Sequence, residues 1–389
     1  MTDKPAMLGG KPIFSEIVPI VSPTLPKLED IKDKVSRILE TGMITNFSQN
    51  MKEFENKVAQ YLNVQHTVAL SNATSGLMLV PKVLNLKGEV ITTSFTFHST
   101  VHALMWNGLT PVFVDINNET YNINPRNIES KITDRTSAIL ATHIFGNPCQ
   151  IDELSKIAKD NNLRLIFDAA HAIGSLYHGK KIGGFGDAEI FSLSATKLLV
   201  TGEGGIITTN NKETYNKFVM GRNYGDPGSY DCQFIGLNSK MQEFSAILGL
   251  KTLEMLESNI QRRNEIAKSF KKKLNILGIK FQRIEEDCRS TYKDFSILID
   301  EEKFGISRDN LCEALKHENI MTKKYFYPPI HKQKAYSAFE DKYKNILLNT
   351  EYVSNNILCL PIYSHMSEST VNGICEAIIR IKEFCNEIK

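Results

Sequence analysis

The 389-residue chain has no long apolar run, no paired-cysteine motif and no excess of charge of one sign. No stretch approaches the roughly 18 consecutive apolar residues of a transmembrane helix, and the first residues lead into no apolar signal segment. A net charge of +2 creates no field that would attract nucleic acid or a membrane surface. We therefore expect a cytoplasmic protein that binds neither nucleic acid nor membranes.

The seven cysteines also lack a pattern, because they are scattered, odd in number and without a C-x-x-C pair. Disulfide frameworks are typical of short secreted chains, and zinc sites show paired spacings. His98 and His102 have the i,i+4 spacing of zinc ligands on a helix, but no glutamate or third ligand accompanies them. The sequence therefore predicts free thiols and no metal site.

What the sequence does contain is a series of short apolar segments, several of them separated by helical patterns. Three helical patterns lie at residues 77–84, 101–106 and 151–160. The predicted buried strands are residues 67–70, 89–93, 110–115, 137–143, 164–168, 188–193 and 205–209. Alternating strands and helices predict an α/β fold with a mostly parallel sheet flanked by helices. Ligands of such sheets bind beyond the carboxyl ends of the strands, so the site is expected there.

The same patterns predict three parts: an N-terminal arm and helix (residues 1–45), a large domain (46–255) and a smaller α+β domain (256–389). The arm carries five prolines. Predicted helices occupy residues 28–39, 51–62, 243–273, 308–318 and 369–388, and strand-like runs of the small domain occupy residues 291–299 and 357–360.

Four features at predicted strand ends stand out. Residues 71–76 are small and polar and open a helix, which suits an anion cradle or a plain helix N-cap equally well. Asp168 ends a buried strand, where a carboxylate needs a cationic partner. Lys197 lies between segments that read as buried, whereas most lysines are solvated. Phe97 follows another strand end, where an aromatic residue usually belongs to the core.

Pyridoxal phosphate is a cofactor that needs all four features. It requires a lysine for a Schiff base and an acidic partner for the ring nitrogen, together with a phosphate cradle and a flat side chain against the ring. Asp168 and Lys197 are 29 residues apart, enough for one strand–turn–strand excursion. Each feature is weak alone, but their order and spacing indicate a pyridoxal-phosphate enzyme with Lys197 and Asp168 as catalytic residues. Burial should lower the pKa of Lys197 towards neutrality, where a base works best.

The chain resembles the DegT/StrS family of sugar aminotransferases, which share the aspartate-aminotransferase fold type. The matching segments are residues 42–45, 71–76, 168–174, 191–197, 203–205, 236–241 and 327–331. The resemblance extends over roughly residues 10–385. It implies a fold-type-I enzyme with a seven-stranded sheet, a pyridoxal phosphate cofactor and a homodimer whose active sites are shared between subunits.

Carried over by position, the resemblance implies cofactor contacts from both subunits. Asn238 would reach the phosphate of the other subunit's site, and Phe97 would stack on the ring. The implied cofactor-binding set is Thr74, Ser75, Phe97, Asp168, His171, Ser192, Lys197 and Asn238. The candidate substrate-binding set, near the matching motifs, is Thr45, Lys240, Tyr325 and His331.

The implied reaction moves an amino group from L-glutamate to a nucleotide-linked keto-sugar. Segments 93–98, 106–108, 146–149 and 167–168 resemble those of enzymes that act on 4-keto-6-deoxyhexoses. We therefore expect a dTDP-4-keto-6-deoxyglucose type of acceptor and a 4-amino-4,6-dideoxy product. A 3-keto-sugar aminotransferase, a pyridoxal-phosphate-dependent sugar dehydratase and a non-catalytic cofactor-binding regulator are alternatives. Lys197 argues against the dehydratases of the family, in which histidine replaces the lysine, and a regulator would not need it.

Overall fold

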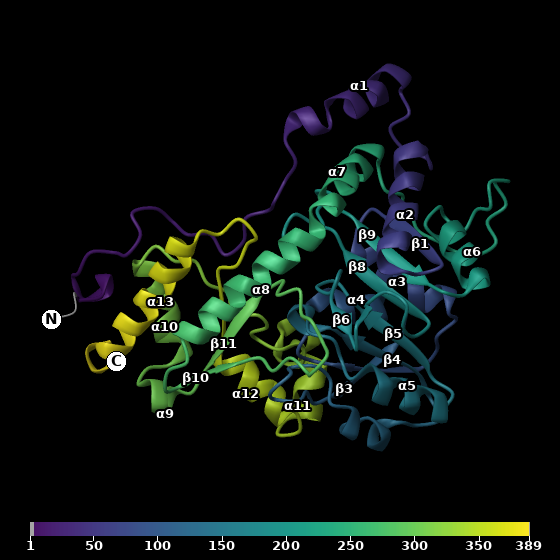
Figure 1. Cartoon of the computed structure of the whole chain (residues 1–389). Helices are drawn as coiled ribbons and strands as arrows, with labels where there is room; N and C mark the ends of the chain where they lie inside the picture. Colours follow the sequence, from purple (N-terminus) through teal and green to yellow (C-terminus); the bar gives the residue numbers. More distant parts are fainter. Residues whose placement is uncertain (1–3, 389) are drawn as a thin grey trace.

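A seven-stranded sheet lies at the centre of the large α/β part, in the order β1-β9-β8-β5-β4-β2-β3 (Figure 1). The computed structural model describes residues 4–388. The strands are β1 (His66–Leu70), β2 (Glu89–Thr93), β3 (Thr110–Val114), β4 (Thr136–Thr142), β5 (Arg164–Asp168), β8 (Ala188–Ser192) and β9 (Gly205–Thr209). Neighbours from β8 to β3 pair in parallel, whereas β9 is antiparallel to both β8 and β1. The predicted fold class, with its mostly parallel seven-stranded sheet, is confirmed.

The antiparallel strand β9 brings three strand ends together at one edge of the sheet. Gly205, which begins β9, pairs with Leu70 at the end of β1 and with Ser192 at the end of β8. A side chain at Gly205 would place its Cβ 2.5 Å from the backbone carbon of Asn72, so only glycine allows this approach. Lys197 belongs to the segment that joins β8 to β9, so it lies at the same edge of the sheet.

Helices cover both faces of the sheet. One face packs against α3 (Ala73–Val83), α4 (His98–Trp106) and α6 (Lys212–Gly221). The other face packs against α2 (Gln49–Leu62), α5 (Ile151–Asp160) and α7 (Glu243–Glu254).

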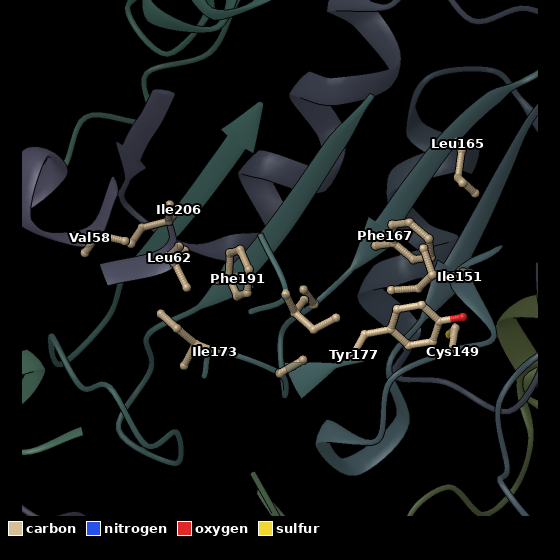
Figure 2. Packing of buried hydrophobic residues seen from close by; sticks show 14 of the residues in the cluster. Val58, Leu62, Cys149, Ile151, Leu165, Phe167, Ile173, Tyr177, Phe191 and Ile206 are labelled. Carbon is tan, nitrogen blue, oxygen red and sulfur yellow. The ribbon is translucent and has the colours of Figure 1, made fainter. Parts of the chain in front are cut away.

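Figure 2 shows part of the core on this second face, where Val58 and Leu62 lie beside Ile206 and where Ile151 lies beside Phe167. Phe167 and Phe191 are fully buried. Each buried side chain of this size contributes about 1.5–3 kcal/mol to stability. This packing fixes the strand ends from which the site is built.

A second core forms around the antiparallel sheet β10-β11-β12 in the C-terminal part of the chain. Its strands are β10 (Ile279–Phe281), β11 (Phe295–Ile299) and β12 (Ile357–Leu360), and the principal helices around it are α8 (Leu256–Lys273), α10 (Arg308–His317) and α13 (Glu368–Glu383). Shorter elements of the chain are α1 (Lys32–Thr41), β6 (Leu176–Tyr177), β7 (Lys180–Lys181), α9 (Glu301–Phe304), α11 (Glu340–Tyr343) and α12 (Leu348–Asn356). Within residues 4–388, no helix combines the length and apolar character needed to cross a membrane.

Two predicted elements differ from the structure. The helix expected at residues 243–273 is two helices, since the N–H of Met255 bonds to the carbonyl of Thr252 at 3.3 Å and interrupts the α-helical pattern. The strand expected at residues 291–299 begins only at Phe295. The residues before it bond to the large α/β part, with the N–H of Lys293 donating to the carbonyl of Phe145 at 3.1 Å. Helix α6 was not predicted from the sequence.

Candidate active site

A cavity of about 360 Å³ opens at the carboxyl ends of β4, β5 and β8. Segments from both parts of the chain line it, including the loop after β2, the start of α3 and the residues just before β11. The residues that line it include Thr74, Phe97, Thr142, Asp168, His171, Ser192, Lys197, Lys293, Asp294, Tyr325 and Phe326. The cavity therefore collects most of the residues that the sequence predicted for the site.

Asp168 lies at the last position of β5 and is 3% exposed. Its carboxylate accepts hydrogen bonds from Thr100 Oγ1 at 2.7 Å and from the N–H of Ala170 at 3.1 Å. Burial raises the pKa of this carboxyl, against these two bonds and the nearby charge of Lys197. A buried carboxylate with only neutral hydrogen-bond donors is costly, so the position is suited to a cationic ligand group.

Lys197 follows β8 and is half-buried, with its N–H bonded to the carbonyl of Ser194 at 2.9 Å. Burial and the positive charge of Lys293 lower the pKa of its ammonium to about 7, while Asp294 and Asp168 act in the opposite direction. This agrees with the expectation from sequence. At neutral pH a substantial fraction of Lys197 is therefore a free amine, the form that acts as a nucleophile or a base.

We predict that Lys197 in the cofactor-free protein reacts with an amine-selective reagent with a midpoint near pH 7, well below the value of about 10.4 for an ordinary lysine. Only the neutral amine reacts, so the rate rises as the pH increases through the pKa. Lys293→Met should move the midpoint upward, because it removes a positive charge that disfavours the protonated form of Lys197. Peptide mapping of the labelled product across pH measures both effects. A midpoint near 10 in the wild type would contradict the prediction.

His171 stands beside the cavity with its ring 9% exposed. Its Nδ1 accepts a hydrogen bond from the N–H of Phe145 at 3.2 Å, which leaves Nε2 as the atom that carries the proton. Burial, together with the charges of Lys197 and Lys293, holds the pKa of His171 well below its usual value. His171 is therefore a neutral hydrogen-bond donor at pH 7.

The start of α3 forms an anion-binding corner of the cavity. Asn72 caps the helix by accepting a bond from the N–H of Ser75 at 2.8 Å, and the N–H groups of the first turn have no partner within the helix. Thr74 and, from the end of β8, Ser192 add hydroxyl groups to the same cavity. Hydroxyls and a helix N-terminus together favour a phosphate group.

Aromatic side chains form another wall. Phe97 is 47% exposed despite following a buried strand, so it is not the core residue that its position would usually indicate. Tyr325 and Phe326 line the cavity from the C-terminal part of the chain. Burial raises the pKa of Tyr325 to about 12, so its hydroxyl stays protonated at neutral pH.

Five predicted site residues lie outside this cavity. Ser75 turns its hydroxyl to the carbonyl of Asn72 at 2.7 Å and to the hydroxyl of Ser239. Asn238 is exposed on the turn before α7, and Lys240 bonds to Asn223 Oδ1 at 3.0 Å. Thr45 lies half-buried between α1 and α2.

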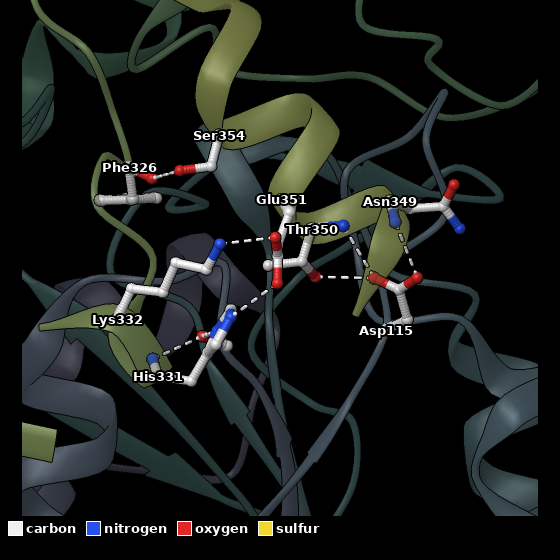
Figure 3. A network of polar contacts seen from close by, with 9 residues as sticks. Asp115, Phe326, His331, Lys332, Asn349, Thr350, Glu351 and Ser354 are labelled. Carbon is white, nitrogen blue, oxygen red and sulfur yellow. Dashed lines mark hydrogen bonds and ion pairs between the residues drawn. The ribbon is translucent and has the colours of Figure 1, made fainter. Parts of the chain in front are cut away.

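His331 is also outside the cavity, and its complete burial does not agree with the expected contact with substrate. Its side chain is fully buried, and Nδ1 lies 2.7 Å from the hydroxyl of Ser94 while Nε2 lies 3.3 Å from Glu351 (Figure 3). Lys332 pairs with the other oxygen of Glu351 at 2.5 Å. Both ring nitrogens are thus occupied, and the residue ties the C-terminal part to the end of β2.

Three residues of the site were missed from the sequence. Thr100, inside α4, positions the Asp168 carboxylate, and Lys293 and Asp294 form an ion pair in the cavity wall. The hydroxyl of Thr100 gives no signal within a helical pattern. For Lys293 and Asp294, the sequence feature that could have indicated a role in the site is a pair of opposite charges inside a largely apolar strand-like run.

The donor set fits pyridoxal phosphate. The cavity holds a buried carboxylate suited to the ring nitrogen and a half-buried lysine with a neutral amine suited to the aldehyde. It also holds a neutral imidazole donor suited to the phenolic oxygen, and a helix N-terminus with hydroxyls suited to the phosphate. Residues 4–388 contain no group of three or more His, Cys, Asp or Glu side chains placed to hold a metal ion.

Comparison with known proteins agrees with this chemistry. The chain is 36% identical to a dTDP-4-amino-4,6-dideoxy-D-glucose transaminase of Escherichia coli over 93% of its length and 98% of the relative's. It is 34% identical to a dTDP-3-amino-3,6-dideoxy-alpha-D-galactopyranose transaminase of Aneurinibacillus thermoaerophilus over 90% of this chain and 95% of that one. The structure of DesI, solved in the presence of its TDP-sugar product, superposes with a TM-score of 0.90 at 32% identity, covering 98% of this chain and 96% of DesI.

Residues 27–379 match the DegT/DnrJ/EryC1/StrS aminotransferase family. The match spans the central sheet, the cavity and the C-terminal sheet. A structure described as a putative PLP-dependent aminotransferase from Bacillus cereus superposes with a TM-score of 0.84 at 25% identity, covering 93% of this chain and 100% of that one. With Lys197 and Asp168 facing one cavity at the sheet's carboxyl edge, the chain belongs to the DegT/DnrJ/EryC1/StrS aminotransferase family.

Proposed function

We propose that the enzyme transfers an amino group from L-glutamate to a dTDP-linked 4-keto-6-deoxyhexose, giving a 4-amino-4,6-dideoxy sugar nucleotide. The observation that carries the proposal is the half-buried Lys197 beside the buried Asp168 in one cavity. The acceptor is argued from similarity to the Escherichia coli transaminase and to DesI.

In this proposal each residue has a separate task. Bound pyridoxal phosphate supplies an electron sink for the reacting carbon. Asp168 would hold the proton on the ring nitrogen of the cofactor, and His171 would donate to its phenolic oxygen. Phe97 would provide a flat surface for the ring. Lys197, as a neutral amine near pH 7, takes a proton from the substrate carbon and returns it during the transfer.

The direct test is incubation of the loaded enzyme with L-glutamate and a panel of nucleotide-linked 3-keto and 4-keto sugars. Mass spectrometry should find an amino group on the dTDP-4-keto-6-deoxy sugar and 2-oxoglutarate in equal amount. A preference for the 3-keto sugar is the second candidate, which similarity to the Aneurinibacillus transaminase favours. Consumption of sugar without glutamate would instead indicate a dehydratase, and no consumption would indicate a regulator.

We further propose a homodimer with shared sites. Asn238 is exposed in one protomer, yet the backbone next to it is fixed, since the N–H of Ser71 bonds to the carbonyl of Ser239 at 2.8 Å. An exposed amide held on a rigid turn is suited to contact another molecule. Its own cavity does not include it, which supports a contact with the cofactor phosphate of the partner's site.

Mixing two inactive variants tests this arrangement. Lys197→Ala and Asn238→Asp homodimers should each have little activity, the second because an added carboxylate repels the phosphate. After the subunits exchange, a mixed dimer has one site with both defects and one intact site if Asn238 acts across the interface. Activity measured after mixing should therefore rise. If Asn238 acts within its own subunit, every site keeps one defect and no activity returns.

Lys240 is the proposed contact for the diphosphate of the sugar nucleotide, since the chain has no global positive field. Lys240→Ala should raise the KM for the sugar nucleotide about tenfold or more, from loss of a charge-assisted hydrogen bond of about 1.5–3 kcal/mol. The glutamate half-reaction, followed by the cofactor spectrum, should not change. Lys217→Ala, which removes an exposed lysine paired with Glu213, is the matched control. Equal slowing of both half-reactions would place Lys240 at the cofactor instead.

A further inference from the structure

Two buried charges in the cavity affect the pKa of Lys197 but make no contact with substrate or cofactor in the proposed chemistry. Lys293 and Asp294 are 5% and 4% exposed and line the same cavity as Lys197. The ammonium of Lys293 bonds to both carboxylate oxygens of Asp294, at 2.9 and 3.1 Å. Burying such a pair costs free energy that the mutual attraction only partly offsets, so its position in the cavity calls for an explanation.

The segment that carries the pair is held in place by several contacts. Arg263 donates to the carbonyls of Tyr292 and Lys293, at 3.0 Å each. Thr291 Oγ1 donates to the carbonyl of His171 at 2.6 Å and occupies the space where a side chain at Gly146 would lie, 2.0 Å from its Cβ position. The N–H of Lys293 bonds to the large α/β part as described above. The pair is therefore fixed relative to the cofactor site.

The pair retains hydrogen-bonding capacity. An ammonium has three donors and a carboxylate has about four acceptor positions. Among residues 4–388, the donor that the structure gives to the Asp294 carboxylate is Lys293, which uses two of its three protons there. At least one donor and two acceptor positions are left, in a wall that faces the cavity.

The charges of the pair select the type of ligand. A carboxylate or phosphate near Lys293 would be repelled by Asp294, and a cation near Asp294 would be repelled by Lys293. A hydroxyl group can donate to Asp294 and accept from Lys293 without either penalty. Resting on the proposed function, we propose that Lys293 and Asp294 together bind hydroxyl groups of the sugar ring of the acceptor and so determine specificity for the sugar.

The test replaces both charges at once. Lys293→Met/Asp294→Asn leaves the net charge of the pair at zero, so the field at Lys197 changes less than in either single variant. Calorimetry on the loaded enzyme compares dTDP-4-amino-4,6-dideoxyglucose with dTDP, which lacks the sugar. We expect the amino-sugar nucleotide to bind about tenfold or more weakly to the variant, as for loss of one or two hydrogen bonds with charged groups. Affinity for dTDP, which lacks the sugar ring, should stay within about twofold.

A matched control is Lys303→Met/Asp300→Asn, the same substitutions in a Lys–Asp pair outside the cavity, whose atoms are 3.3 Å apart. It should leave both affinities unchanged. A sugar nucleotide lacking one ring hydroxyl provides the complementary test. If the missing hydroxyl is one that the pair contacts, the wild type should bind the deoxy analogue more weakly than the parent sugar nucleotide. The variant should bind the analogue and the parent with equal affinity.

Equal weakening of dTDP and the sugar nucleotide, or no change in either, would overturn the inference while leaving the proposed function intact. The inference would also be overturned, with the proposed function intact, if each deoxy analogue lost the same affinity for the wild type as for the variant. Failure of the wild type to bind or convert any nucleotide sugar would overturn the proposed function, and the inference with it.

Discussion

Lys197→Ala is expected to reduce transamination by about 10⁴-fold, the upper end of the range for loss of a positioned acid–base group. The variant should still bind pyridoxal phosphate, because the cradle at α3, Asp168 and His171 are untouched. Turnover and cofactor absorbance are measured on the same preparation. Retained cofactor with lost turnover separates a chemical role of Lys197 from a structural one.

A covalent assignment complements this variant. Borohydride reduction of the loaded wild type, followed by peptide mapping, should place the label on Lys197. Lys293 lies in the same cavity and is the most informative competitor. Lys251, a half-buried lysine paired with Glu254, serves as a distant control. A label on Lys293 would refute the assignment.

Asp168→Asn should reduce turnover by about 10²–10³-fold, about 3–4 kcal/mol of barrier, since the neutral amide no longer stabilises a protonated ring nitrogen. The amide is nearly isosteric and can still accept one of the two hydrogen bonds from Thr100 and Ala170, but it cannot hold a proton on the ring nitrogen. Steady-state rates and the melting temperature are compared with those of the wild type.

The expected pattern is a large kinetic loss with a small change in melting temperature. Thr100→Val is the matched control, because it removes a neutral contact to the same carboxylate and should have a smaller kinetic effect. Turnover of Asp168→Asn within about threefold of the wild type, below about 1 kcal/mol of barrier, would contradict the role in the ring-nitrogen contact.

Much of the sheet could be predicted from the sequence because its strands are short buried runs with polar residues at their ends. Asp168 and Ser192 end β5 and β8, and Lys197 follows the second of these, so the pattern that marked the strands also marked the site. The direction of β9 could not be predicted in this way. An apolar run has the same appearance whichever way the strand points, and only its pairing distinguishes the two.

Other features depend on contacts between distant segments. Lys293 and Asp294 reach the cavity because Arg263 and Phe145 hold their backbone, and neither contact has a local signature. The segment was therefore read as the start of a strand. His331 was expected to contact the substrate because it lies in a segment that matches the family, whereas contacts with Ser94 and Glu351 hold it in the interior.

The pairing of β1 with β9 also determines the order in which the protein can be assembled during synthesis. Strand β1 is at the edge of the sheet, and the strand it pairs with, residues 205–209, leaves the ribosome long after residues 66–70. At about 5–20 residues per second the delay is on the order of ten seconds. Val68, Ala69 and Leu70, fully buried in the finished sheet, have no strand to pair with during that interval. A nascent chain that stops before Gly205 thus carries an unpaired apolar strand, and the corner that receives the phosphate closes only after β9 is made.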